Sequence, residues 1–508
     1  MTDGVPLNRV AITASIMLAT SMTMLDSTIV NVALPQIQGS LSATPDQITW
    51  LLTSYMVAMA IATPLSGWMA GRIGLKHTIL LNIAGFTLAS MLCGIATGLA
   101  ELVFYRLLQG LFGAALIPLS QTVLFNINPP ERHAQAMAIW SSGSLLGPIM
   151  GPILGGYLTE TFSWRWCFYI NLPIGLLALA GVMIFMPRED ESRRRPFDVL
   201  GFSALAVGLC ALQLMLDRGS GEDWFTSPEI WTYTVIAAGS AWVYVAHSLT
   251  AEHPFFDRAL FRNRNLITGC LFCFYTGSVM FASSALVPII MQTLMGYPPI
   301  LAGLMNLPRG LGMLVAAVIA GRLASRMDLR LLLLMSLLIG TGGVWMMTLF
   351  DLMMDDRLLL LSGFLQGFGT AMFFVPITAL AFITVAPDIR AEASALFNMV
   401  RNIGASVGIA MLQAQAVANT RALHEAMAGR VNPEDQALAA ALPAAYDPTT
   451  VAGRFMLDGE ISRQAMMAAY VNDFRILLIG CVLVLPLILL LQAPQGGAQG
   501  GAAPVAAD

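Results

Sequence analysis

One aspartate, Asp26, stands inside an otherwise apolar run that begins near Val10 and ends near Pro35. A carboxylate at the centre of a membrane-spanning helix costs about 2.5–3.5 kcal/mol, so such groups face the interior of a helix bundle and commonly serve transport. Desolvation favours the protonated carboxyl, and a nearby cation favours the ionised one. We therefore expect Asp26 to load and release a proton at the wall of an interior cavity. A structural role, bracing neighbouring helices, is the alternative.

A second polar stripe follows one face of the apolar segment 101–125 and contains an arginine, Arg106. The residues that share this face at helical spacing are Arg106, Gln109, Gly110, Gly113, Ser120 and Gln121. We expect Arg106 to supply a counter-charge for Asp26 or for an anionic group. In the alternative, Arg106 lies near the outer interface, which Glu101 marks, and extends its charged end into water.

Other polar side chains within apolar segments are candidates for the wall of a substrate cavity. They are Asn31, Gln109, Gln121, Arg309, Asn398 and Arg401. No catalytic or metal-ligand motif accompanies them, and the single lysine, Lys76, rules out a GxxxxGK phosphate loop. The pattern predicts a protein that is not an enzyme, needs no cofactor and draws energy from a proton gradient.

Membrane helices must position these groups, because only 11% of the 508 residues are charged and 57% are apolar. A soluble protein carries roughly 25% charged residues. A spanning helix needs about 20 mainly apolar residues, so we predict an all-α polytopic membrane protein with fourteen spans. Their approximate limits are 10–34, 48–70, 78–98, 101–125, 135–158, 167–187, 197–217, 229–249, 265–291, 299–324, 330–350, 357–381, 392–418 and 474–492.

The basic residues predict the orientation of these spans. They gather in the N-terminal segment and in the loops on one side, whereas the short loops on the other side carry Arg165, Arg218 and Arg357. Because cytoplasmic loops are enriched in Lys and Arg, both termini are predicted to be cytoplasmic. The polar segment 419–473 then lies outside, where its Ala-rich stretches are expected to form short amphipathic helices.

An internal repeat divides the chain into two halves. GWMAGRIGLK (67–76) resembles GRLASRMDLR (321–330), and the LQG at 108–110 recurs at 365–367, an offset of 257. Parallel repeats of this kind are typical of transporters whose halves rock about a site near the midplane. The predicted organisation is as follows: a six-helix half (1–190), two inserted helices (191–262), a second six-helix half (263–492) with its outer loop at about 419–473, and a disordered cytoplasmic tail (493–508).

Glycines recur every four residues in the segment 143–156, GSLLGPIMGPILGG. Such GxxxG spacing lets another backbone approach closely, which predicts a close-packed, bendable helix at the seam between the halves. The residues concerned are Gly143, Gly147, Pro148, Gly151, Pro152, Gly155 and Gly156.

The loop motif GWMAGRIGLK is predicted to lie on the cytoplasmic side and to act as a conformational switch. Its residues Gly67, Gly71 and Gly74 permit close packing, while Arg72 and Lys76 can bind helix C-termini or acids of a neighbouring helix. Simple anchoring by positive charge is the alternative.

Together these segments resemble the major facilitator superfamily, and within it the fourteen-helix drug:proton antiporters. LDSTIVNVALP contains Asp26 and Asn31, RLLQGLFGAALIPLS contains Arg106 and Gln109, and SGSLLGPIMGPILGGYL is similar to the antiporter motif of exporters. The family often has Asp where this chain has Gly71, which puts the usual acid-centred loop relay in doubt. LDRGSGEDWF (216–225) and the long outer loop resemble one type of multidrug exporter, which implies a periplasmic membrane-fusion adaptor and an outer-membrane channel as partners.

The sequence thus predicts a proton-coupled antiporter of a bacterial inner membrane that exports hydrophobic or amphipathic compounds by alternating access. A dedicated exporter of one metabolite, lipid or siderophore is the alternative within transport. A polytopic membrane enzyme, such as an acyltransferase, is disfavoured by the internal repeat and by the absence of a catalytic motif. A sensor or scaffold would leave Asp26 without a chemical task.

Overall fold

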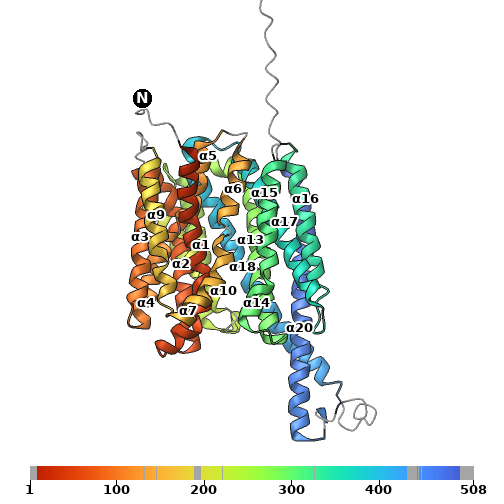
Figure 1. Ribbon diagram of the computed structural model, residues 1–508. Helices are drawn as coiled ribbons and strands as arrows, with labels where there is room; N and C mark the ends of the chain where they lie inside the picture. Colours follow the sequence, from red (N-terminus) through yellow and green to blue (C-terminus); the bar gives the residue numbers. More distant parts are fainter. Residues whose placement is uncertain are drawn as a thin grey trace, which may run out of the picture.

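A computed structural model describes residues 8–491, except 130–131, 145, 188–195, 220, 325, 432–442, 444–445 and 448. The described residues form helices, turns and loops, and no strand. The helices stand side by side in two groups, with the N-terminal group and the C-terminal group next to one another (Figure 1). The predicted all-α fold is confirmed.

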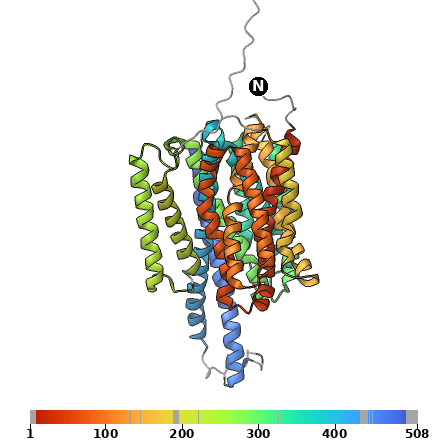
Figure 2. The ribbon, with the colours of Figure 1, turned by 90° about the vertical axis from the view of Figure 1, so that its left-hand side faces the viewer.

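The described residues of the N-terminal half form nine helices. They are α1 (Arg9–Ser40), α2 (Pro45–Ile73), α3 (Leu75–Ile95), α4 (Leu99–Gly113), α5 (Leu116–Ile127), α6 (His133–Ser144), α7 (Leu146–Thr161), α8 (Trp166–Tyr169) and α9 (Asn171–Phe185). Two further helices, α10 (Val199–Arg218) and α11 (Pro228–Thr250), pack on each other and stand to one side of the bundle (Figure 2).

After the short helix α12 (Arg258–Arg262), the C-terminal half follows. Its helices are α13 (Arg264–Ile289), the π-turn η3 (Ile290–Leu294), α14 (Pro299–Met305), α15 (Leu307–Leu323), α16 (Leu329–Met347), α17 (Asp356–Phe382), α18 (Arg390–Ala428), α20 (Val451–Val484) and the 3-10 helix η6 (Leu485–Leu490).

Twelve helices of the described chain are long and apolar enough to cross a membrane. The predicted spans 229–249 and 265–291 correspond to α11 and α13, which are not among the twelve although they contain 23 and 26 residues. The membrane-spanning character is therefore confirmed, and the count of fourteen stays a prediction.

Three spans that were predicted as continuous helices are broken in the structure. The breaks separate α4 from α5, α8 from α9, and α14 from α15. Each lies within four residues before a proline, namely Pro118, Pro173 and Pro308. Because proline has no N–H to bond the carbonyl four residues earlier, a break at these points leaves few backbone groups unpaired.

The outer segment differs from the prediction of short amphipathic helices. Instead, α18 and α20 continue as 39- and 34-residue helices that project beyond the bundle (Figures 1 and 2). Residues 432–442, 444–445 and 448 of this segment lie outside the described residues, so the prediction of a short helix in the Ala-rich stretch 437–445 stays untested. The long extensions were not predicted because hydropathy marks where a membrane span ends, whereas a helix continues for as long as its backbone and neighbours allow.

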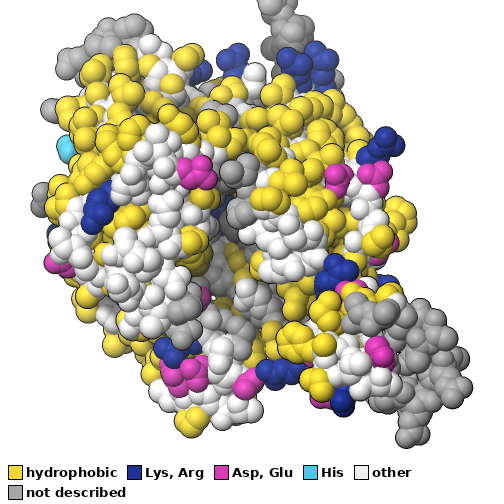
Figure 3. Space-filling model, turned by 60° about the horizontal axis from the view of Figure 1, so that its bottom comes forward, with side chains coloured by type: hydrophobic (Ala, Val, Ile, Leu, Met, Phe, Trp, Pro, Cys, Tyr) yellow, Lys and Arg dark blue, Asp and Glu magenta, His cyan; other side chains and the backbone are white. Residues whose placement is uncertain are grey.

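The two halves contact each other mainly at one end of the bundle. There α18 packs against α2 and α5, and α6 packs against α15 and α17. We call this end, at which α1 begins, the closed end. At the opposite end, which we call the open end, a hollow separates the halves (Figure 3). The structure is thus one access state of a two-half bundle.

The glycine-rich helix α7 packs against α1 within its own half. A Cβ at Gly147 would lie 2.7 Å from the backbone nitrogen of Leu25, and Gly151 and Gly155 also face the α1 backbone. Gly143, on α6, faces the Met17 side chain of α1. Close backbone approach is therefore confirmed, but the main partner is α1 rather than the other half. Across the seam, Ile149 of α7 meets Gly310 of α15.

We expect Gly147→Ala to destabilise the protein by about 1–3 kcal/mol, because the added methyl group overpacks α7 against α1. Thermal unfolding of the purified protein in detergent measures this change. The matched control is Gly156→Ala on the same helix, where no atom lies within 4 Å of the added Cβ. Equal unfolding temperatures for the two variants would show that α7 does not depend on this close approach.

Candidate functional site

Asp26 lies inside the N-terminal half, where α1, α4 and α9 meet, and its side chain is 0% exposed. Its Oδ2 accepts a hydrogen bond from Arg106 Nη1 at 2.6 Å. Its Oδ1 accepts hydrogen bonds from Gln109 Nε2 at 2.8 Å and from Asn171 Nδ2 at 2.9 Å. The predicted pairing of Asp26 with Arg106 is confirmed. The expected place on a cavity wall is wrong for this state, because the carboxylate is sealed from water.

Arg106 is also 0% exposed, so the alternative of an interfacial arginine is wrong. Its Nη1 also donates to Gln109 Oε1 at 2.7 Å, and its Nε donates to the carbonyl of Leu51 at 3.5 Å. The guanidinium carbon lies 4.3 Å from the centre of the Tyr55 ring. The cation is therefore held by α1, α2 and α4 together.

A buried pair of opposite charges persists only when its hydrogen bonds replace the water that it has lost. Here three donors reach the two carboxylate oxygens. Arg106 Nη2 and Asn171 Oδ1 have no hydrogen-bond partner among the described residues. The site is therefore almost saturated, and a change in the charge of Asp26 forces its neighbours to rearrange.

Asn171 is the functional residue that the prediction missed. It is 0% exposed and donates to Ser90 Oγ at 2.9 Å as well as to Asp26. Ser90 in turn donates to the carbonyl of Phe168. An amide at the start of an apolar helix is the signal that was available, but nothing in the sequence indicated that α9 would bring Asn171 against α1.

The six predicted cavity residues lie in different surroundings. Gln109 belongs to the Asp26 site, and Gln121 and Asn398 bond to each other across the halves. Arg309 is 8% exposed and packs against Gly367 of α17. Asn31 is exposed, and half-buried Arg401 has its guanidinium carbon 6.0 Å from the ring centre of Phe374. A substrate-binding role for these residues stays a prediction.

A group of hydrogen bonds, which we call the latch, joins the halves near the closed end. Asn398 Nδ2 and Ser394 Oγ of α18 both donate to Gln121 Oε1 of α5, at 2.7 and 3.0 Å. Near the start of α18, Arg390 Nη1 donates to the Phe125 carbonyl at 3.2 Å. Gln121 Oε1 thus accepts two of the latch bonds, while Ser394 Oγ also donates to the Pro118 carbonyl and Arg390 Nη1 also donates to Asn126 Oδ1.

The predicted switch loop takes part in this contact through a glycine rather than through its charges. A Cβ at Gly67 would lie 2.8 Å from Glu392 Cα of α18, whereas Lys76 Nζ binds the Met183 carbonyl at 2.8 Å within its own half. Lys76 thus binds the C-terminal end of α9, which is one of the two kinds of contact predicted for it. Gly74, at φ 86°, makes the turn between α2 and α3. Arg72 is exposed, and Gly71 has open space around it.

The inserted helix α10 bonds to both halves. Gln213 Oε1 accepts from Ser406 of α18 at 2.8 Å, and Asp217 accepts from Thr53 of α2. These bonds lie on neighbouring turns of α10, which packs against α2 and α18. When one half moves against the other, α10 must therefore lose its hydrogen bond to one half and move together with the other half.

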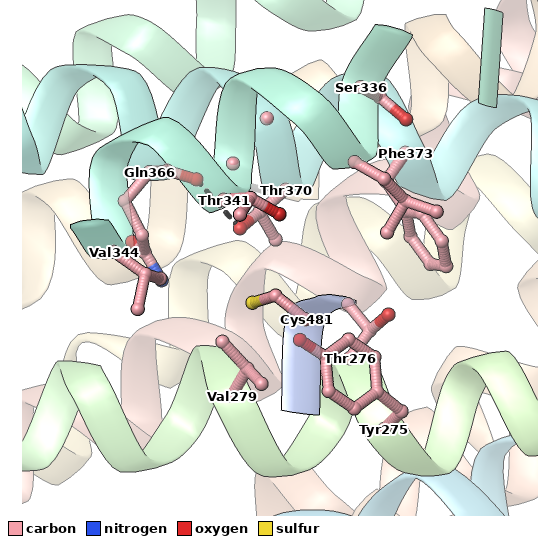
Figure 4. Close-up of a pocket in the computed structure, with 13 residues that line it drawn as sticks. Tyr275, Thr276, Val279, Ser336, Thr341, Val344, Gln366, Thr370, Phe373 and Cys481 are labelled. Atoms are coloured by element: carbon pink, nitrogen blue, oxygen red, sulfur yellow. Dashed lines mark hydrogen bonds between the residues drawn. The ribbon is translucent and has the colours of Figure 1, made fainter. Parts of the chain in front are cut away.

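The C-terminal half carries a neutral counterpart of the Asp26 site. Gln366 Nε2 donates to Ser283 Oγ at 2.8 Å, and both residues lie 257 positions after Gln109 and Asp26. Beside them is a cavity of about 40 Å³ bordered by Tyr275, Thr341 and Cys481 (Figure 4). It has room for two or three waters and not for a drug-sized molecule. No group of three His, Cys, Asp or Glu side chains suited to a metal is found in the described chain.

Comparison with known proteins agrees with this architecture. Residues 16–409 match the model of the Major Facilitator Superfamily. The chain is 35% identical to "Multidrug export protein EmrB" of Escherichia coli K12, over 97% of both chains. It is 36% identical to "Fatty acid resistance protein FarB" of Neisseria gonorrhoeae, over 79% of both chains.

Solved structures share the fold at low identity. The human organic anion transporter MFSD10 superposes with a TM-score of 0.60 at 14% identity, covering 94% of this chain and 100% of that one. The proton:xylose symporter XylE gives a TM-score of 0.57 at 14% identity, covering 92% of this chain and 94% of that one. On the family match, the shared fold and the two-half bundle, this chain belongs to the major facilitator superfamily.

Proposed function

We propose that this protein is a proton-coupled exporter of hydrophobic or amphipathic compounds, working by alternating access in a bacterial inner membrane. The observation that carries the proposal is the sealed Asp26–Arg106 ion pair in a bundle whose halves meet mainly at one end. The names of its relatives, EmrB and FarB, support export of toxic compounds. The chain is then a transporter and not an enzyme, with the proton gradient in place of a cofactor.

The proposed cycle places the closed end in the cytoplasm and the open end toward the periplasm, in line with the basic loops. When a proton binds, Asp26 becomes neutral and Arg106 loses its counter-charge. Removing one partner of a buried pair costs about 3–5 kcal/mol, so the protonated site favours a different packing of α1, α4 and α9. Proton entry supplies about 2.3 kcal/mol per 100 mV of membrane potential, in addition to the pH gradient.

The projecting ends of α18 and α20 then lie in the periplasm. A relative's export role and this rigid outer extension support a periplasmic membrane-fusion adaptor and an outer-membrane channel as partners. The fatty-acid resistance named for FarB keeps a dedicated lipid exporter as the second candidate.

We expect the protein, expressed in a host that lacks its own efflux pumps, to lower the accumulation of several unrelated lipophilic compounds. An uncoupler should abolish this effect, because the gradient is the energy source. Fluorescent and radiolabelled substrates, with a long-chain fatty acid in the same panel, measure it. Efflux of the fatty acid alone would favour the dedicated exporter, and unchanged accumulation throughout would contradict export.

We expect Asp26→Asn to abolish proton-driven efflux in proteoliposomes, because the amide cannot take up the proton. Exchange of labelled for unlabelled substrate, which needs no net proton movement, should continue. The control for stability is Asp26→Asn combined with Arg106→Gln, which removes the unpaired buried cation and should restore thermal stability without restoring coupling. Normal uphill transport by Asp26→Asn would remove Asp26 from the coupling role.

We expect Gln121→Met to shift the protein away from the state described, because the variant keeps the side-chain volume but removes the acceptor of two latch hydrogen bonds. Each bond contributes about 0.5–1.5 kcal/mol, and about 1.4 kcal/mol shifts a population tenfold. Spin labels at Ser40 and Met353, outer positions of opposite halves, should report shorter distances. Gln292→Met, at an exposed glutamine, is the control; identical distance distributions would contradict the role of the latch.

A further inference from the structure

A second buried carboxyl group, Asp473, lies in the C-terminal half on α20. Its side chain is 0% exposed, and neither Oδ1 nor Oδ2 has a hydrogen-bond partner among the described residues. The residues of α20 before Ala465 are mostly exposed, and buried positions recur at helical spacing from Ala465 onward. Asp473 is therefore about two turns inside the bundle from the point at which α20 enters it.

The surroundings of Asp473 are apolar. On its side of α20 lie Tyr470, Phe474 and Leu477, and the Phe474 ring packs 5.7 Å from that of Phe350. These residues belong to one buried cluster with side chains of α13, α16 and α18. The site thus resembles a protein core rather than a hydrated cavity.

No cation among the described residues forms a hydrogen bond or an ion pair with this carboxyl group. On α20 itself, Tyr470 is its titratable neighbour, and the exposed Arg475 donates to Asn472 Oδ1 instead. The helices that pack against α20 carry titratable residues that form neither a hydrogen bond nor an ion pair with it: Arg264, Cys270, Cys273 and Tyr275 on α13, Arg330 on α16, and Arg390, Glu392, Arg401, Arg421, His424 and Glu425 on α18. The segments η3 and η6 carry none.

An isolated ionised carboxylate in such a place costs several kcal/mol, so a buried acid without a partner takes up a proton instead. Asp473 is therefore neutral in the state described. The two halves then hold their buried acids differently: Asp26 is paired with Arg106, and Asp473 is protonated without a counter-charge. If α20 separates from α18, Asp473 becomes exposed to water and can then release its proton.

We propose that Asp473 is a second proton-binding site of the transport cycle, located in the C-terminal half. Its carboxylate takes a proton from water at the open end and keeps it while α20 is packed against α13, α16 and α18. It returns the proton to water on the side of the closed end when that packing opens toward that side, so that one proton crosses the membrane. Because α18 also carries the latch residues Ser394 and Asn398, the state of the latch is linked to the burial of Asp473. This proposal rests on the proposed proton-coupled function.

The protonated form is tested directly by infrared spectroscopy of the full-length protein in lipid vesicles at neutral pH. A neutral carboxylic acid gives a carbonyl-stretch band distinct from that of a carboxylate. We expect this band in the wild type, in Asp26→Asn and in the control Asp458→Asn, which alters an exposed acid of the same helix. Asp473→Asn should lose the band. A band that persists unchanged in Asp473→Asn would overturn the assignment.

The role in transport is tested by the number of protons moved per substrate in proteoliposomes. We expect Asp473→Asn to lower this ratio by one with unchanged substrate affinity, whereas a purely structural residue would lower the yield of folded protein and leave the ratio intact. Asp473→Leu, which matches the apolar surroundings, serves if the asparagine variant does not fold. An unchanged ratio in a folded variant would overturn the proposal. The coupling role of Asp26 is tested separately, by measuring proton-driven efflux in the Asp26→Asn variant.

Discussion

An ion pair sealed from water is the constraint on which the N-terminal half depends. Asp26 and Arg106 are both 0% exposed, so protein groups must replace the hydrogen bonds that water makes to exposed charges. Those bonds come from Gln109 on α4, Asn171 on α9 and the Leu51 carbonyl on α2. Four helices are thus held in register by one pair of charges, and any chemistry that neutralises the carboxylate acts on all four at once.

Small residues make this arrangement possible because they let helices approach until polar groups can meet. Gly110 illustrates the point: a Cβ there would lie 2.5 Å from the Tyr55 carbonyl, on the turn of α4 next to Arg106 and Gln109. A larger residue would push α2 away and open the space around the guanidinium. The glycines that face α1 from α7 do the same on the other side of Asp26. The buried ion pair therefore depends on close helix packing, because this packing excludes water from the charges.

The sequence predicted those features that follow from the cost of placing a group in lipid. That cost indicated the interior position of Asp26, and the shared face of α4 indicated Arg106 as its partner. This cost does not indicate that α9 turns Asn171 toward α1, or that Gln121 bonds to the other half. Both contacts depend on packing between segments that are distant in the sequence. For the same reason, the glycine helix was assigned to the seam between the halves although it packs mainly on α1. Helix breaks and the outer extensions were missed because hydropathy does not register them.

The two halves of the internal repeat differ at the positions of the buried ion pair. At the position of Asp26 the C-terminal half has Ser283, and at that of Arg106 it has Gly363, while Gln366 keeps the hydrogen bond of Gln109. The repeat thus retains the amide that links two helices and discards both charges. If each half had a buried ion pair, both halves would be stabilised equally. Protonation of one pair would then leave the other pair to oppose the movement of the two halves. With both charges in the N-terminal half, the proposed protonation of Asp26 acts on that half alone, and the buried acid of the C-terminal half, Asp473, lies on another helix.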